Sequence, residues 1–137
     1  MSTSDFVLAP PPTSERRREL WIQHTVGFIL FEDVRGWAMQ RLDPNLDATA
    51  KAAALQAIND TVYGLMMVID GVSGSLRNSE YSVHLQTKAC LKRTGSDGVT
   101  YSLDLNDGDG FCLAYHGWLE GDFGDDPVLL SSSPPAR

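Results

Sequence analysis

Residues 81–93 read YSVHLQTKACLKR, and this stretch decides the predicted fold. Its odd-numbered positions are mostly apolar and its even-numbered positions mostly polar, which is the two-residue period of a strand with one buried face. The same odd-numbered apolar pattern recurs in residues 99–105 (VTYSLDL) and 111–119 (FCLAYHGWL). The separators, residues 94–98 and 106–110, consist of residues that turns favour. The sequence therefore predicts a three-stranded antiparallel meander in which Leu91 lies opposite Leu103 and Leu105 opposite Phe111.

A first helical pattern precedes these strands and covers residues 13–42. Thr13 or Ser14 supplies a hydroxyl that can accept a backbone N–H at the helix start. Apolar side chains follow at spacings of three, four and seven residues, which places them on one helical face. Pro44 marks the end, because the residue before a proline avoids helical geometry.

A second helical pattern covers residues 48–69, with Asp47 as its predicted cap and Asp70-Gly71 as its predicted end. The link between the two patterns, residues 43–47, is short, so we expect the helices to form an antiparallel pair. The predicted fold class is α+β: two antiparallel helices packed on one face of a three-stranded, or slightly larger, antiparallel meander.

The chain of 137 residues is expected to form a single α+β domain over residues 13–130. Residues 1–12 and 131–137 are rich in Pro or Ser and offer little to bury, so both are predicted to be disordered tails. Residues 1–12 do not resemble an export signal, and the longest apolar runs are too short to span a bilayer. We therefore expect a cytoplasmic protein with reduced cysteines and no membrane partner.

The charge of the chain is unevenly distributed. The net charge is −7, and residues 94–137 carry all of the excess, because residues 1–93 hold equal numbers of acidic and basic side chains. Nucleic acid is excluded as an expected partner, since phosphate binding needs a basic surface and the one basic cluster is Arg16-Arg17-Arg18. The charge favours a basic protein partner.

The candidate metal and catalytic motifs are incomplete. His84, His116, Cys90 and Cys112 share the even-numbered face of the predicted sheet. The spacing within each strand, His84 to Cys90 and Cys112 to His116, is too wide for one zinc ion, and the strand between Cys90 and Cys112 separates them too far for a disulfide. Residues 104–110 (DLNDGDG) resemble part of a calcium loop, yet the two strongest ligand positions are not acidic. We therefore predict no cofactor, no metal site and no catalytic residue.

The last third of the chain contains one distinctive cluster, GWLEGDFGDDP at residues 117–127. Carboxylates alternate there with glycine and two large aromatic residues. An aromatic anchor surrounded by charge is a common design of specific protein interfaces. The predicted partner-binding residues are His116, Trp118, Glu120, Asp122, Phe123, Asp125 and Asp126.

Residues 61–74 (TVYGLMMVIDGVSG) and 117–128 resemble stretches of small uncharacterised bacterial α+β proteins, and the resemblance extends over residues 18–128. A compact acidic α+β chain is also similar in type to bacterial immunity proteins. That similarity implies a protein that neutralises a cognate toxin by covering its basic active site. It transfers no site residue.

These observations lead to one main hypothesis and two alternatives. The main hypothesis is a non-catalytic immunity or inhibitor protein that presents the acidic segment and the even-numbered face of the sheet to a basic partner. The first alternative is a small-molecule or metal-dependent enzyme that uses His84, His116 and nearby carboxylates. The second is a homo-oligomeric structural protein whose interface is the polar face or an edge strand of the sheet.

Overall fold

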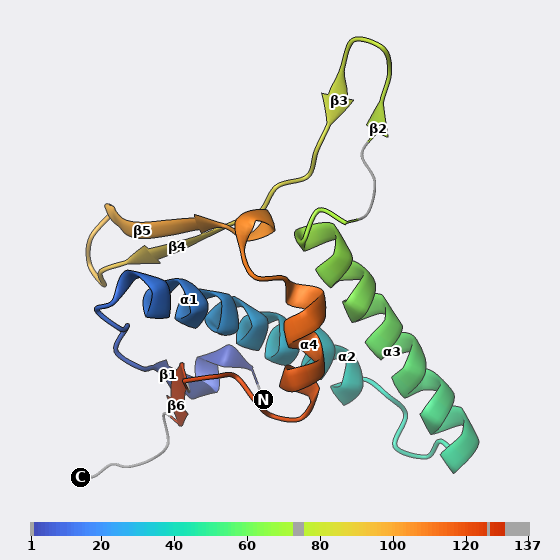
Figure 1. Ribbon diagram of the computed structural model, residues 1–137. Helices are drawn as coiled ribbons and strands as arrows, with labels where there is room; N and C mark the ends of the chain where they lie inside the picture. The colour runs from blue at the N-terminus through green and yellow to red at the C-terminus, as the bar shows by residue number, and fades with distance from the viewer. Residues whose placement is uncertain (1, 73–75, 126, 131–137) are drawn as a thin grey trace, which may run out of the picture.

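The computed structural model describes residues 2–72, 76–125 and 127–130, and within them the fold is α+β (Figure 1). Its sheets are three antiparallel strand pairs, β1–β6, β2–β3 and β4–β5. The elements, in chain order, are η1 (Thr3–Asp5), β1 (Phe6–Leu8), α1 (Glu15–Leu30), the π-helical turn η2 (Phe31–Arg35), α2 (Gly36–Gln40), α3 (Ala48–Ile69), β2 (Leu76–Arg77), β3 (Ser82–Val83), β4 (Lys88–Lys92), β5 (Val99–Asp104), η3 (Leu105–Asp107), α4 (Phe111–Leu119) and β6 (Val128–Leu130).

The first predicted helix is confirmed as a continuous rod formed by α1, η2 and α2. The Ser14 side chain accepts a hydrogen bond from the backbone N–H of Arg17 at 3.4 Å and so caps the helix as expected. The π turn adds one wide turn within the rod. Beside it, the Arg35 side chain donates to Asn59 of α3 at 2.8 Å, which ties the two helical segments together.

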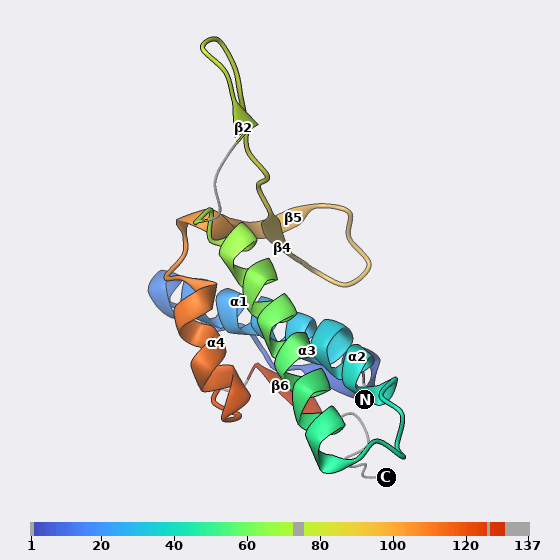
Figure 2. The same ribbon diagram turned by 90° about the vertical axis from the view of Figure 1, so that its right-hand side faces the viewer.

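The bounds of α3 also agree with the prediction. The Asp47 carboxylate accepts the backbone N–H of Ala50 at 2.8 Å, and Gly71 ends the helix with a φ of +74°. Helix α3 packs on α4, on η2 and on α2, and Figure 2 shows it crossing the front of the molecule beside α4. The predicted fold had only two helices, so it did not include α4, which lies beside α3.

Strands β4 and β5 form the expected hairpin with a different register. Leu91 pairs with Tyr101 and Ala89 pairs with Leu103, whereas the sequence suggested Leu91 opposite Leu103. Because this shift is two residues, the odd-numbered side chains remain on one face. Ala89 and Leu103 pack against the core, and the Arg18 guanidinium of α1 lies 4.8 Å from the centre of the Tyr101 ring.

The predicted third strand is wrong, because residues 111–119 form helix α4. Its buried residues, Phe111, Tyr115 and Trp118, recur at the four- and three-residue spacing of a helical face. Large apolar side chains at 111, 113, 115 and 119 satisfy a two-residue period equally well, which is why the sequence suggested a strand. The three-stranded meander is therefore replaced by the β4–β5 hairpin followed by a helix.

The start of α4 is capped by a residue that lies far away in the sequence. The residue before the helix, Gly110, has no side chain and adopts a φ of +105°. Instead, the two carboxylate oxygens of Asp70 accept the backbone N–H groups of Phe111 and Cys112 at 2.6 and 2.8 Å. Asp70 directly follows α3, so this single side chain joins the end of α3 to the beginning of α4.

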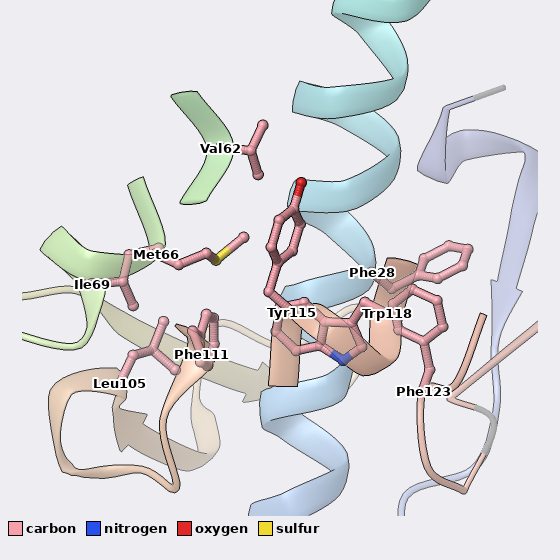
Figure 3. Packing of buried hydrophobic residues seen from close by; sticks show 9 residues of the cluster. All are labelled: Phe28, Val62, Met66, Ile69, Leu105, Phe111, Tyr115, Trp118 and Phe123. Carbon is pink, nitrogen blue, oxygen red and sulfur yellow. The ribbon is translucent and has the colours of Figure 1, made fainter. Parts of the chain in front are cut away.

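The hydrophobic core lies between α1, α3 and α4 (Figure 3). Trp118 is its largest fully buried side chain, and its ring lies against Gly27 of α1. A Cβ atom at Gly27 would be 2.2 Å from the indole, so only glycine allows this approach. The buried members of the cluster are Phe28, Val62, Met66, Ile69, Leu105, Phe111, Tyr115, Trp118 and Phe123.

The N-terminal segment is more ordered than the sequence suggested. Within residues 1–12, which we expected to be disordered, β1 pairs with β6 near the other end of the chain. The backbone N–H and the hydroxyl of Thr3 both donate to Asp33, at 2.9 and 2.6 Å, and these hydrogen bonds lower the pKa of Asp33. Residues 131–137, the other predicted tail, lie outside the described residues.

Of the described helices, α3 alone is long and apolar enough, by length and composition, to cross a membrane. Its most apolar window is 17% buried, and Val62, Met66 and Ile69 of the helix belong to the hydrophobic core. Much of the composition is alanine, the strongest helix former, in the exposed first half of the helix. The expectation that the protein has no membrane partner remains a prediction.

We expect Asp70→Ala to lower the free energy of unfolding by about 1–3 kcal/mol, because two backbone N–H groups at the start of α4 lose their acceptor. Urea unfolding followed by circular dichroism measures this change. Asp97→Ala removes an exposed carboxylate from the β4–β5 turn and serves as the control. Equal effects of the two substitutions would show that the cap does not stabilise the fold.

A pair of glycine substitutions tests the packing of Trp118. Gly27→Ala is expected to destabilise the protein by at least about 2 kcal/mol, since its methyl group overlaps the indole ring. Gly64→Ala in α3 meets no atom within 4 Å and is expected to stabilise the protein by about 0.5–1 kcal/mol through helix propensity. Thermal unfolding should give shifts of opposite sign, and shifts of the same sign would contradict the packing described.

Candidate partner-binding surface

The two predicted aromatic anchors are in the core. Trp118 is 1% exposed and Phe123 is 9% exposed, and their rings stack with centres 6.0 Å apart. In Figure 3 both side chains point inward from α4 and from the turn after it. Neither can act as a surface anchor while the protein is folded. Helical geometry at residues 111–119, rather than an extended strand, turns Trp118 toward α1.

The polar residues predicted at the site remain on the surface. His116, Glu120, Asp122 and Asp125 are exposed, and Asp126 lies outside the described residues. His116 projects from α4 beside Tyr63 of α3, with ring centres 6.0 Å apart. The predicted acidic cluster is thus retained as a surface, although without its aromatic centre.

The arginine cluster of α1 neutralises part of the excess acidity. Arg17 forms an ion pair with Asp125 at 3.1 Å, and Arg16 forms one with Asp109 at 2.8 Å. Both pairs are exposed, so they contribute little stability, but they reduce the charge available to a partner. The Arg16 guanidinium, together with a hydrogen bond from Gln23, lowers the pKa of Asp109.

Glu120 and Asp122 differ from Asp125, which forms an ion pair with Arg17. Among the described residues, no Lys, Arg or His forms an ion pair with either carboxylate. Asp122 accepts the backbone N–H of Gly124 at 3.0 Å, and this donor carries no charge. Within the described part of the chain, the turn after α4 therefore presents two exposed carboxylates that form no ion pair.

Sequence reasoning missed the apolar part of this surface. Leu113 is 77% exposed and Leu119 is 39% exposed, although the predicted strand placed both on the buried face. On α4, Leu113 and His116 are three residues apart and share the outward face of the helix, and Glu120, the residue that caps its C-terminal end, follows four residues after His116. The helical spacing of Phe111, Tyr115 and Trp118 was the sequence signal that could have revealed this face.

The residues of the enzyme alternative are not brought together. His84 lies in the segment between β3 and β4 and contacts the Ser82 hydroxyl at 3.0 Å, whereas His116 lies on α4. The described residues contain no group of three or more His, Cys, Asp or Glu side chains that could hold a metal ion. Cys112 is half-buried beside Asp70, and burial, together with that carboxylate, raises its pKa, which disfavours the reactive thiolate.

One further titratable side chain, His24, contacts the buried side of α4. His24 of α1 accepts the indole N–H of Trp118 at its Nδ1 atom, at 3.0 Å. It lines a hollow of about 200 Å³ with Arg17, Trp21 and Asp125. Burial lowers the pKa of His24, and the charges of Asp122, Asp125 and Asp109 partly oppose that effect. The neutral form of His24 is the one that can accept the hydrogen bond.

The comparisons with known proteins identify no relative of this chain. No protein-family model matches it, and no curated protein or solved structure matches it.

We expect the free energy of unfolding to fall as the pH drops below about 6.5. The folded pKa of His24 lies below its ordinary value of 6.5, so the unfolded chain binds the proton more readily. The contribution of His24 is complete above that pH and is lost as the pH falls toward the folded pKa. Urea unfolding of the wild type at a series of pH values measures the slope.

Two variants test whether His24 causes this change of the free energy of unfolding with pH. His24→Asn keeps an acceptor near Trp118 but cannot be protonated, so the decrease between about pH 7 and pH 5 should become smaller. His84→Asn makes the same substitution at an exposed histidine outside the core and serves as the control. A wild-type slope in the His24 variant would show that another group is responsible.

Proposed function

We propose that this chain is a small acidic, non-catalytic binding protein of the immunity or inhibitor type. Its partner would be a basic protein, which it would bind through the outer face of α4 and the acidic turn after it. The observation that carries the proposal is the exposed side chain of Leu113, 77% accessible, on the same face of α4 as His116 and near Glu120 at the C-terminal cap of the helix. We call this set of residues, with Leu119 and Asp122, the α4 surface.

The α4 surface has the composition of a small interface. Leu113 and Leu119 offer apolar area for burial, and a few such residues usually supply most of the binding energy. His116 lies beside them, and Glu120 and Asp122 follow at the end of the helix. An apolar centre beside a charged rim is the usual arrangement of specific protein interfaces.

The charges of the α4 surface determine the kind of partner. Glu120 and Asp122 have no described cationic partner, in contrast to Asp125, whose charge is paired with Arg17. The chain as a whole carries a net charge of −7. A basic protein would be attracted over a longer range than direct contact, which accelerates association.

The even-numbered face of the β4–β5 hairpin is left out of the proposed surface. Sequence reasoning included this face, but Lys88 and Lys92 lie exposed on it. These side chains would repel a basic partner. The proposal is therefore confined to α4 and the turn that follows.

The first test identifies the partner and measures how the acidic residues act. Proteins captured from a cell extract by the immobilised chain are identified, and the association rate of a purified candidate is measured at low and high salt. The double variant Glu120→Gln/Asp122→Asn should slow association about tenfold at low salt and flatten its salt dependence. The control Asp97→Asn/Glu80→Gln removes the same charge elsewhere and should keep the wild-type rate.

Leu113→Ser separates the apolar contribution from the charge. It should increase the dissociation rate of the complex and leave the association rate nearly unchanged, because a buried contact acts after encounter. Capture of no basic protein would contradict the proposal. So would equal association rates for the two double variants, or a wild-type dissociation rate for Leu113→Ser.

A further inference from the structure

A β-hairpin projects from the body of the protein, and we call residues 76–85 the arm (Figures 1 and 2). It contains β2 and β3, which pair Leu76 with Val83 and Arg77 with Ser82. Asn78 orders the turn, because its side-chain oxygen accepts the backbone N–H groups of Glu80 and Tyr81. The arm is therefore a defined ribbon with two distinct faces.

One face of the arm is apolar and the other is polar. Strand alternation places Leu76, Tyr81, Val83 and Leu85 on one side and Arg77, Ser82 and His84 on the other. The apolar side chains are 82%, 72%, 70% and 69% exposed, in that order. The sequence predicted that helices would cover this face, but in the described structure it is open to solvent.

An isolated two-stranded ribbon is only marginally stable in water, and its apolar face needs a partner. A contiguous apolar surface of this kind is typical of an interaction site. We infer that the apolar face of the arm is an interface between two copies of this chain, which pack their arms face to face about a two-fold axis. The inference goes beyond the proposed function and uses none of the residues of the α4 surface.

The charges of the arm favour a second copy as the occupant. A two-fold interface brings the same surface together with itself, so that surface must be complementary to itself. The arm carries one basic side chain, Arg77, and one acidic side chain, Glu80, and hence no net charge apart from His84. Two chains of net charge −7 can approach one another at this surface without the repulsion that the rest of the chain would impose.

The same charges disfavour the other candidate occupants. Nothing in a neutral arm selects the basic protein that the α4 surface would attract. An anionic membrane would repel a chain of net charge −7. Within the arm, the single acidic residue, Glu80, cancels the charge of the single basic residue, Arg77, so the arm has no excess of positive charge to attract anionic lipid. A neutral lipid surface is left as an outcome for the experiment to decide.

The area of the arm indicates the strength of the dimer. A standard interface buries about 800 Å² on each partner. Tyr81 at about 150–250 Å² and three aliphatic side chains at about 60–120 Å² each, reduced to their exposed fractions, supply roughly 350 Å². Slightly less than half of a standard interface corresponds to a dimer of modest affinity that dissociates on dilution.

The test is the molecular mass of the full chain in solution. Sedimentation or light scattering from about 5 µM to about 1 mM should show a concentration-dependent rise from 15.0 kDa toward twice that mass. Backbone NMR signals of residues 76–85 should shift with concentration, while those of α4 stay constant. A wild-type chain that remains a monomer at about 1 mM overturns the inference.

A matched pair of variants locates the interface. Val83→Glu places a charge on the apolar face and should weaken the dimer at least about tenfold. Ser82→Glu places the same charge one residue away, opposite Arg77, and should leave the dimer at wild-type strength. Fluorescence of the buried residues Trp21 and Trp118 verifies that both variants are folded.

Two other results would also overturn the inference. Equal dimerisation of Val83→Glu and Ser82→Glu would place the interface elsewhere. Binding of a monomeric wild-type chain to neutral phosphatidylcholine vesicles, with loss of binding in Val83→Glu, would assign the face to lipid. Neither variant alters the α4 surface, so the inference can fail without affecting the proposed function.

Discussion

The carboxylate of Asp70 is the constraint on which much of this fold depends. Asp70 directly follows α3, and its carboxylate accepts the first two N–H groups of α4, so it fixes where α4 begins and how α4 lies against α3. Helix α4 has nine residues and begins after a glycine, which makes it a weak helix in isolation. With the cap in place, its apolar face can be buried between α1 and α3, and Trp118 reaches Gly27.

This arrangement also decides which side chains are left for binding. Once Trp118 and Phe123 enter the core, the aromatic residues of the acidic segment stabilise the fold and are not available to a partner. The outer face of α4 then carries Leu113 and His116 instead. Arg16 and Arg17 of α1 form ion pairs with Asp109 and Asp125, whereas Glu120 and Asp122 at the end of α4 form none with the described residues. Both features support the proposal that α4 and the turn after it bind a partner.

The sequence predicted local features better than their assembly. Both long helices, their caps at Ser14 and Asp47, the end of α3 at Gly71 and the β4–β5 hairpin follow from short-range patterns, and all are observed. The predicted three-stranded meander failed at residues 111–119, where a two-residue and a helical period fit the same apolar residues. The candidate site was predicted in part, because the acidic residues stayed exposed while their aromatic neighbours did not.

By itself, the sequence determined the α+β class, the net negative charge and its concentration after residue 93, because composition, capping residues and turn residues act locally. Only the tertiary structure decided that residues 111–119 are helical, since their cap comes from Asp70 about 40 residues earlier in the chain. It also decided that the alternating residues 81–85 face solvent on a projecting arm. A two-residue alternation specifies that one face is apolar, but what covers that face depends on segments far away in the chain or on another molecule.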